Sequence, residues 1–340
     1  MVDKAFIHVG FMKTASTYLQ KNFFASISDN NFKYINNVDG FREILNHIRY
    51  ENLQADKDLL KSVIDFFDKY KNYKIIISSE ALVGSPYYNY LNRDNIWNNL
   101  KLIFCDISIL MIVRKQISYF DSLYTQTLHE GFHQSYKSFL NIHHGLFDKH
   151  KPLSRNAINL NVKSQNYNEF YNFFSSKSFV SNVKVLPYEL LIDSKKTFLK
   201  TIAKDFLKSN CDDIVNKLSN EDDKPNKSYS QLSVNIAKIF NRFMVSNHIG
   251  GIRFIPQKPF FKTFDKIYKK SNIKLFKYLR GISARLTLRY FLQGFVNKLN
   301  YKKPRYMSNE SYNKLMSIFY ESNKELDEKL NLNLSRYNYY

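Results

Sequence analysis

The sequence contains few of the residues on which several protein classes depend. It has only two cysteines among 340 residues, Cys105 and Cys211, which excludes a disulfide framework or a cysteine-based zinc module and favours a reducing compartment. Nine glycines and seven prolines are too few for a collagen-like or low-complexity chain. With 44% hydrophobic residues the chain is not a disordered protein, and it is long enough for one large core or two modest ones.

Long apolar runs are also absent from the sequence. No stretch approaches the ~20 consecutive apolar residues that a membrane-spanning helix requires. The N-terminal residues Met1-Val2-Asp3-Lys4 lead directly into a strand-like run and do not have the pattern of a signal peptide. We therefore expect a cytoplasmic protein.

Acidic residues are scarce, and the shortage is concentrated in one segment. The chain has 51 Lys and Arg residues against 30 Asp and Glu residues, a formal net charge of +21. Between Lys238 and Tyr306 there are 17 basic residues and a single acid, Asp265, so this segment alone carries +16. Such a segment is typical either of a solvated basic face or of a surface that meets nucleic acid, an anionic membrane or an acidic glycan.

The first 210 residues alternate strand-like and helix-like segments. Uninterrupted runs of Ile, Leu and Val predict strands that are covered on both faces, as in a parallel sheet. The predicted strands are residues 5–9, 74–79, 107–113 and 182–186, and the predicted helices begin near Ser16 and cover 40–49 and 53–70. The alternation predicts the α/β class, a three-layer, doubly wound parallel sheet.

The character of the sequence changes after about Leu218, where a polar loop precedes segments that we interpret as helix and connector. Residues 308–330 have the pattern of an amphipathic helix. We predict an α/β core of residues 1–237, with a C-terminal helix in residues 307–340 that packs back on it. Residues 238–306 are predicted to form a basic, aromatic-rich, mostly helical elaboration.

The segment VGFMKTASTY, residues 9–18, joins the first predicted strand to the first predicted helix. A loop in this position directs backbone N–H groups at an anion, the helix dipole adds partial positive charge, and Lys13 adds a full charge. No glycine directly precedes Lys13, so this is not a Walker A sequence. The pattern therefore favours a phosphate-binding loop of another class over a surface loop that only caps a helix.

A second motif follows the third apolar strand. Arg114 ends that strand, and Ser122 lies eight residues further on, two turns along the next predicted helix. Ligands of open α/β sheets bind at the carboxyl ends of the strands, and Arg binds phosphate through two parallel hydrogen bonds. The pair is therefore a candidate phosphate site, although a lone arginine also serves as an ion-pair partner or a helix cap.

Together these segments resemble the PAPS-dependent sulfotransferases, most of all the bacterial carbohydrate-type members. In that family a strand–loop–helix of the form G-x-x-K-T-G-T-T binds the 5′-phosphosulfate of 3′-phosphoadenosine 5′-phosphosulfate (PAPS). A strand-ending Arg with a Ser eight residues later binds the 3′-phosphate, as Arg114 and Ser122 would here. The loop positions that match the family are Gly10, Lys13, Thr14 and Thr17, whereas Ala15 and Ser16 stand in place of its Gly and Thr.

Two further segments are similar to parts of the same family. LPYELL, residues 186–191, resembles the strand and Tyr-Glu segment near the adenine, which would place Tyr188 there. NKSYS, residues 226–230, resembles the late loop that covers the donor, with Lys227 and Ser228 as its binding residues. The resemblance covers roughly residues 5–230 and the last helix, and it implies PAPS as co-substrate with no metal.

Glu80 directly follows the second apolar strand. A carboxylate beside a partly desolvated site can have its pKa raised toward neutrality, as a general base requires. In the family that the motifs resemble, the corresponding strand end carries the catalytic base, which is Glu in the glycan-modifying members. The alternative is a Glu at a helix start that interacts with the helix dipole.

Three histidines need separate interpretations. His129 and His133 form the H-E-x-x-H pattern of zinc proteases, but Gly131 interrupts the helix on which both ligands would have to lie. We therefore expect these two histidines on the acceptor side of the site or on the surface. His8, inside the first strand, is expected to be a buried structural histidine.

The predicted function is transfer of the sulfuryl group from PAPS to a hydroxyl of a glycan or glycolipid. Lys13 and the loop amides would neutralise the leaving group, Glu80 would take the acceptor proton, and Arg114 with Ser122 would hold the 3′-phosphate. Residues 238–306 would bring the protein to an anionic membrane at the inner face.

The sequence also allows two alternative functions. A nucleotide-dependent kinase is disfavoured because no acid ends a strand to hold Mg²⁺; Asp106 precedes its strand instead. A non-enzymatic nucleic-acid-binding protein would account for the charge but leave both motifs unexplained, so no specific nucleic acid is expected as a partner.

Overall fold

The structure is a computed structural model that describes residues 2–27, 31–143, 146–147, 158–221, 228–245, 255–256, 266–267, 269–270, 292–299 and 302–340. The chain divides into two compact units. The first comprises residues 1–119, 163–223 and 313–340, and the second comprises residues 120–162 and 224–312. The predicted basic elaboration therefore falls within the second unit, and most of it lies outside the described residues.

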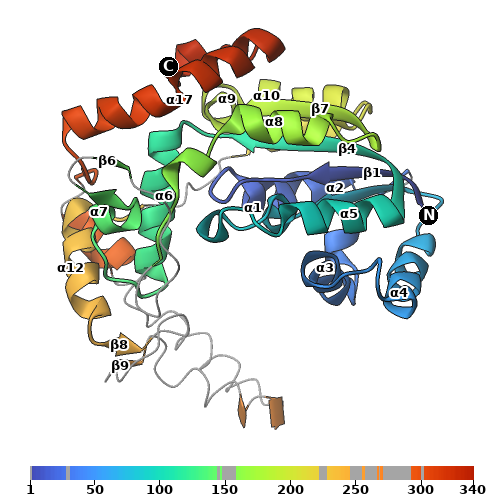
Figure 1. The fold of residues 1–340 in the computed structure, drawn as a ribbon, viewed down its shortest axis with the longest axis horizontal. Helices are drawn as coiled ribbons and strands as arrows, with labels where there is room; N and C mark the ends of the chain where they lie inside the picture. Colours follow the sequence, from blue (N-terminus) through green and yellow to red (C-terminus); the bar gives the residue numbers. More distant parts are fainter. Residues whose placement is uncertain are drawn as a thin grey trace. The chain divides into compact units, whose positions relative to one another are not determined.

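A five-stranded parallel sheet forms the centre of the first unit (Figure 1). In spatial order its strands are β2 (Phe32–Tyr34), β3 (Lys74–Ser78), β1 (Val2–His8), β4 (Phe104–Val113) and β7 (Val180–Pro187). The predicted α/β class and parallel sheet are confirmed. Four strands were predicted from the sequence, and β2, only three residues long, was not.

Alternate residues of the strands face opposite sides of the sheet, and both sides are covered. On one side Phe6, Ile76 and Leu110 pack in a common core. The covering elements on that side are α1 (Ser16–Tyr18), η1 (Leu19–Phe24), α2 (Ala25–Ile27), α10 (Lys195–Thr201), η6 (Ile202–Phe206) and α11 (Asp212–Asn220).

The other side of the sheet is covered by α4 (Lys57–Asp68), α5 (Arg93–Ile103) and α8 (Tyr167–Ser175). The rings of Phe67 on α4 and Phe104 on β4 lie 4.9 Å apart, and those of Trp97 and Phe174 lie 4.8 Å apart. The first unit therefore has the three predicted layers. Its remaining elements are η2 (Ile35–Asn37), α3 (Phe41–Tyr50), η3 (Glu80–Val83), η4 (Pro86–Tyr88), α9 (Tyr188–Asp193) and η8 (Leu334–Tyr337).

The predicted C-terminal helix is α17 (Asn309–Leu330). A reciprocal pair of amide hydrogen bonds joins it to the start of α6 (Gln116–His129): Gln116 Nε2 donates to Asn323 Oδ1 at 2.9 Å, and Asn323 Nδ2 donates to Gln116 Oε1 at 3.1 Å. Both side chains are buried, so each amide satisfies the other. This contact fixes the helix to the segment that follows Arg114.

The second unit contains the rest of α6 and a set of short elements. These are α7 (Tyr136–Phe139), β5 (Ile142–His143), β6 (Leu146–Phe147), α12 (Gln231–Asn241), β8 (Met244–Val245), β9 (Ile255–Pro256), η7 (Leu292–Val296) and α16 (Asn297–Leu299). Asn241 at the end of α12 donates to the carbonyls of Leu128 and Phe132, both at 2.8 Å, and so ties α12 to α6. Within the described parts of the chain, no helix has the length and apolar character needed to span a membrane.

Candidate active site

The loop between β1 and α1 has an unusual backbone at two of the residues that the sequence singled out. Lys13 and Ala15 both have φ of 65°, in the left-handed region. Thr14 lies between them, is buried, and donates its hydroxyl to Phe11 O at 2.5 Å. Alternation of left-handed residues turns successive N–H groups to one side of a loop, which is the arrangement that binds anions. The first turn that starts at Ser16 adds N–H groups without intrahelical partners.

Arg114 supports this loop from the neighbouring strand. It follows β4 directly, and its Nη1 donates to the carbonyl of Lys13 at 2.8 Å. Its guanidinium lies over the ring of Tyr188, 4.7 Å from the centroid. The Arg114 Nε is buried without a hydrogen-bond partner among the described residues. The arginine therefore links the loop to Tyr188, and these contacts leave the N–H at its Nε unused.

Glu80 lies at the end of the other neighbouring strand, as the first residue of η3. Ser79 positions it by capping this turn, with its Oγ accepting from Ala81 N at 3.2 Å. Burial raises the pKa of the Glu80 carboxyl, while the nearby Ser16 side chain and the charge of Lys13 lower it. Because both of those residues act on Glu80, the structure brings loop and carboxylate together at the carboxyl edge of β1 and β3.

Glu189, next to Tyr188 in α9, holds the backbone directly after Arg114 in place. Its Oε1 accepts from Lys115 N at 3.1 Å and its Oε2 accepts from Tyr339 OH at 2.7 Å. The hydroxyl of Tyr167 donates to Arg114 O at 2.7 Å. Sequence reasoning missed Tyr167 and Tyr339, since a lone tyrosine far along the chain carries no motif.

Phe11, one of the unspecified residues of the loop motif, anchors the loop to an aromatic cluster. Its ring lies 5.1 Å from that of Tyr167 and 5.0 Å from that of Phe170, both on α8. It is fully buried. A large apolar side chain directly after Gly10 was the available signal for this anchor.

The remaining predicted site residues lie in the second unit. Ser122 is half-buried on α6, and Ser228 is exposed shortly before α12. Lys227 lies outside the described residues. The roles of these three residues remain predictions.

The two histidines of the H-E-x-x-H pattern do not share a helix. Helix α6 ends at His129, and Gly131 has φ of 95°, so the chain turns away before His133. The ring of His129 packs edge-on against Tyr229 at 4.3 Å. A zinc-protease site needs both histidines one turn apart on one helix face, which this geometry does not provide.

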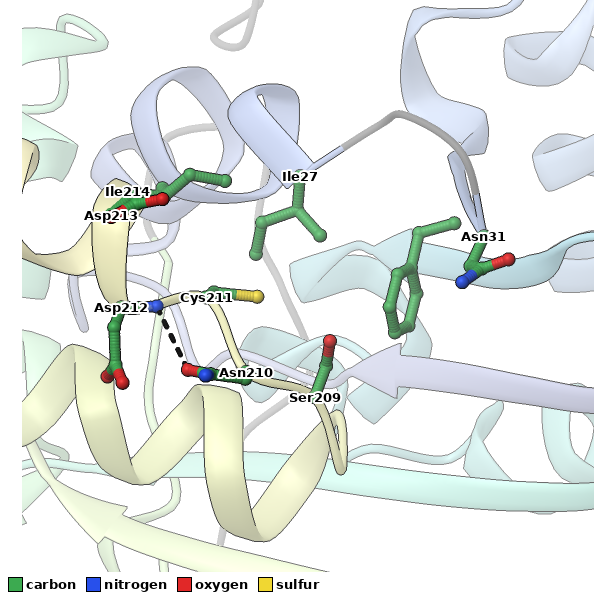
Figure 2. A pocket seen from close by; sticks show the side chains of 9 residues that line it. Ile27, Asn31, Ser209, Asn210, Cys211, Asp212, Asp213 and Ile214 are labelled. Atoms are coloured by element: carbon green, nitrogen blue, oxygen red, sulfur yellow. Dashed lines mark hydrogen bonds between the residues drawn. The ribbon is translucent and has the colours of Figure 1, made fainter.

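No cluster of three or more His, Cys, Asp or Glu side chains that could hold a metal occurs within the described ranges. A cavity of about 400 Å³ lies elsewhere in the first unit, between Ile27 at the end of α2, Phe32 at the start of β2 and the loop before α11 (Figure 2). Asp212 N donates to Asn210 Oδ1 at 3.3 Å in that loop. None of the predicted site residues lines this cavity, which is at the amino end of β2.

The arrangement at the carboxyl edge of β1, β3 and β4 combines a loop with two left-handed residues, a lysine, an arginine and a carboxylate whose pKa is raised by burial. The cationic groups can hold a phosphorylated ligand, and the carboxylate can accept a proton beside it.

Comparisons with known proteins find similarity among solved structures. No family model matches the sequence, and no curated protein matches it. Among solved structures, a chain described as "Sulfotransferase Domain from the Curacin Biosynthetic Pathway" aligns with 93% of this chain and 97% of its own length, at 12% sequence identity and a TM-score of 0.37.

Proposed function

We propose that this protein is a PAPS-dependent sulfotransferase whose acceptor is a hydroxyl of a glycan or glycolipid. One observation carries the proposal: Lys13, Glu80 and Arg114 come from three separate segments and meet around the loop after β1. Sulfuryl transfer needs positive charge at the leaving phosphate, a base for the acceptor proton and an anchor for the nucleotide. These three side chains supply one of each.

In the proposed reaction the acceptor oxygen attacks sulfur in line with the bond from sulfur to the 5′-phosphate oxygen. That bond breaks as the new oxygen–sulfur bond forms, and the leaving phosphate keeps the electron pair. Lys13 and the loop N–H groups stabilise its charge. Glu80 takes the hydroxyl proton, for which its raised pKa suits it.

Arg114 and Ser122 are proposed to bind the 3′-phosphate, with Tyr188 beside the adenine. The buried Nε of Arg114, without a partner in the described structure, supports this role. Arg114→Ala should weaken adenosine 3′,5′-bisphosphate by ~1.5–3 kcal/mol, the range for a charge-assisted hydrogen bond. Equal affinity of wild type and variant in calorimetry would remove Arg114 from the donor site.

A thermal-shift panel tests the donor class. We expect adenosine 3′,5′-bisphosphate to raise the melting temperature without added metal, because bound ligand stabilises the folded state. Stabilisation only by ATP with Mg²⁺ would instead support a kinase, and stabilisation only by an oligonucleotide would support nucleic-acid binding. Transfer of labelled sulfate from PAPS to a panel of sugars and glycolipids then identifies the acceptor.

Residues 238–306 are proposed to bring the enzyme to an anionic membrane surface at the cytoplasmic face. Their charge of +16 supports this, since each Lys or Arg near an anionic leaflet contributes about 1 kcal/mol. Lys266, Lys269 and Lys270 are exposed, as are the apolar side chains of Ile239 and Phe243 at the end of α12. A segment that has both exposed cations and exposed apolar groups is typical of an interfacial segment.

Sedimentation with anionic and neutral vesicles over a salt series tests this surface. Charge reversal of Lys266, Lys269, Lys270 and Lys274 should reduce binding to anionic vesicles and leave nucleotide affinity intact. Equal recruitment by both kinds of vesicle would show that the segment is a solvated basic face.

A further inference from the structure

Helix α12 exposes a row of large apolar side chains that the proposed reaction does not use. This outer row consists of Leu232, Ile239, Phe240 and Phe243, which are 44–58% exposed. At 3.6 residues per turn the four positions fall within an arc of about 100°, so they share one face of the helix. Phe243 belongs to the same face because its N–H donates to Phe240 O at 2.9 Å, which continues the helical turn past Asn241.

The side of α12 that packs on the protein is a different one. Its buried residues are Ser233, Val234, Ala237 and Asn241. Asn241 holds this side to α6 through its two hydrogen bonds to the carbonyls of Leu128 and Phe132. A surface helix normally has one apolar stripe, which faces the core, and polar residues elsewhere. The outer row is therefore a second apolar face, and it is exposed to solvent.

The neighbouring element η7 exposes a further aromatic side chain. Phe295 on η7 is 55% exposed. The same short element is fixed to α12, since Ser233 Oγ donates to Leu292 O at 3.3 Å. Asn297 directly after η7 accepts from Ser230 N at 2.8 Å. An exposed phenyl ring is thus held on an element that hydrogen-bonds the first turn of α12.

The charged residues of these two segments all have one sign. Residues 228–245 and 292–306 contain six basic residues and no acid. Four of the six lie in the segment after η7, which is attached to the start of α12: Gln231 N donates to Lys302 O at 2.8 Å, and Arg305 N donates to Gln231 Oε1 at 3.0 Å. Lys302, Lys303, Arg305 and Arg242 are exposed. The surface formed by α12 and its neighbours is therefore both apolar and cationic.

This combination distinguishes between classes of partner. A second copy of the chain would bring the same positive charge to the contact, and like charges repel. A nucleic acid would pair with the cations but would leave the aliphatic side chains of Leu232 and Ile239 without a partner. An anionic lipid leaflet matches both properties, because its phosphates attract Lys and Arg while its acyl chains accept Leu, Ile and Phe.

We propose that α12 is an interfacial helix that inserts its outer row into the headgroup and acyl boundary of an anionic lipid leaflet, while Arg242, Lys302 and Lys303 bind lipid phosphates. The proposal rests on the proposed membrane association of residues 238–306. It deepens that association by placing the contact on a helix that begins before the basic segment, and by requiring insertion in addition to attraction between charges.

Tryptophan fluorescence on the full chain tests insertion directly. Phe243→Trp places an indole in the outer row, and Tyr320→Trp on α17 is the control, since Tyr320 is 45% exposed but is followed by the acidic Glu321. Trp97 is fully buried and gives both variants the same background. With phosphatidylglycerol vesicles that carry brominated acyl chains, we expect the emission of Phe243→Trp to shift to the blue and to be quenched. Tyr320→Trp should show neither change.

Loss of apolar surface without loss of charge tests the same face by binding. Phe240→Ser should weaken binding to phosphatidylglycerol vesicles about tenfold, because a half-exposed phenyl ring no longer enters the acyl boundary. Tyr320→Ser should bind like wild type, although Tyr320 is as exposed as Phe240. Ile239→Ser provides a second variant of the outer row, and equal melting temperatures of all variants and wild type would show that each is folded.

The outcomes separate this proposal from the others. Vesicles that recruit the protein without quenching Phe243→Trp would overturn insertion by α12 and leave association by charge standing. Blue-shifted emission of Phe243→Trp without vesicles would show that the chain itself covers the outer row, and would also overturn the proposal. Failure to bind anionic vesicles at all would refute membrane association together with the role of α12. Wild-type protein that transfers no sulfate from PAPS would refute only the proposed reaction.

Discussion

Ala15 is the loop residue whose replacement gives the sharpest test of the loop geometry. It has φ of 65° and ψ of 14°, a left-handed conformation that costs an L-residue other than Gly, Asn or Asp roughly 1–2 kcal/mol. Glycine adopts the same conformation without that cost. Ala15→Gly should therefore relieve strain in the folded state, at the position where the sulfotransferase motif has its glycine.

The net effect of Ala15→Gly is smaller than the strain that it removes. Glycine gives the unfolded chain more freedom, which costs about 0.5–1 kcal/mol, and the lost methyl group is half-buried, which costs a few tenths of a kcal/mol more. The expected gain in the free energy of unfolding is about 0.5 kcal/mol.

Ala25→Gly provides a matched control. Ala25 is half-buried like Ala15 but has φ of −64° and ψ of −31°, so it is helical. The control deletes the same methyl group and adds the same freedom to the unfolded chain, and it should destabilise by about 1 kcal/mol. The difference between the two substitutions therefore isolates the left-handed cost, roughly 1–2 kcal/mol in favour of Ala15→Gly.

Urea unfolding followed by tryptophan fluorescence measures this difference. Trp97 is the only tryptophan of the chain and is fully buried in the first unit, so its emission reports on the unit that contains the loop. Equal m values would show that both variants expose the same surface on unfolding, so that their free energies of unfolding can be compared directly. A difference below about 0.5 kcal/mol, or one of opposite sign, would refute the left-handed geometry at Ala15.

Three further predictions concern the same site. Gly10→Ala should lower the free energy of unfolding by ~1–3 kcal/mol and weaken nucleotide binding, because the added Cβ would lie 2.4 Å from Ser16 Oγ. Gly294→Ala is the control: its added Cβ would have no atom within 4 Å, so it should not destabilise the protein. Urea unfolding measures the stability of both variants, and calorimetry measures their nucleotide affinity. Glu80→Gln should keep nucleotide affinity and lower kcat by about 10²-fold or more, and the wild-type acidic limb should lie above the ordinary carboxyl range because burial raises the pKa of Glu80. The pKa of His8 is about 3 when folded and ~6.5 when unfolded, so the unfolded chain takes up the proton first and stability falls as pH drops below ~6.5. From pH 6 to 5 this histidine should cost about 1.2 kcal/mol, which urea unfolding of wild type against His8→Asn would detect as a steeper pH dependence in wild type.

Much of the sheet could be predicted because its signal is local. Residues 75–77 and 109–113 are apolar at every position, which is typical of strands covered on both faces. Strand β2 could not be found in the same way, because Phe32-Lys33-Tyr34 is too short to show a period. This strand forms because it pairs in parallel with the edge of β3.

The candidate site was predictable where a residue ends a strand. Lys13, Glu80 and Arg114 follow three different strands, and the carboxyl ends of parallel strands meet at one edge. The partners that fix them were not predictable. Tyr167 and Tyr339 act through single hydrogen bonds across long stretches of chain, and no spacing rule specifies such contacts.

The carboxylate of Glu189 joins all three stretches of chain that make up the first unit. Lys115 belongs to the first stretch, Glu189 to the second and Tyr339 to the third. Contacts between such distant residues raise the contact order and slow folding, because long loops must close before the contacts form. During synthesis, the hydrogen bond from Tyr339 to Glu189 can form only after Tyr339 has been added, more than two hundred residues after Arg114. Until then the turn that follows Arg114 lacks part of its support. We therefore expect ligand binding to appear late in the life of the nascent chain, as one of the last properties that it acquires.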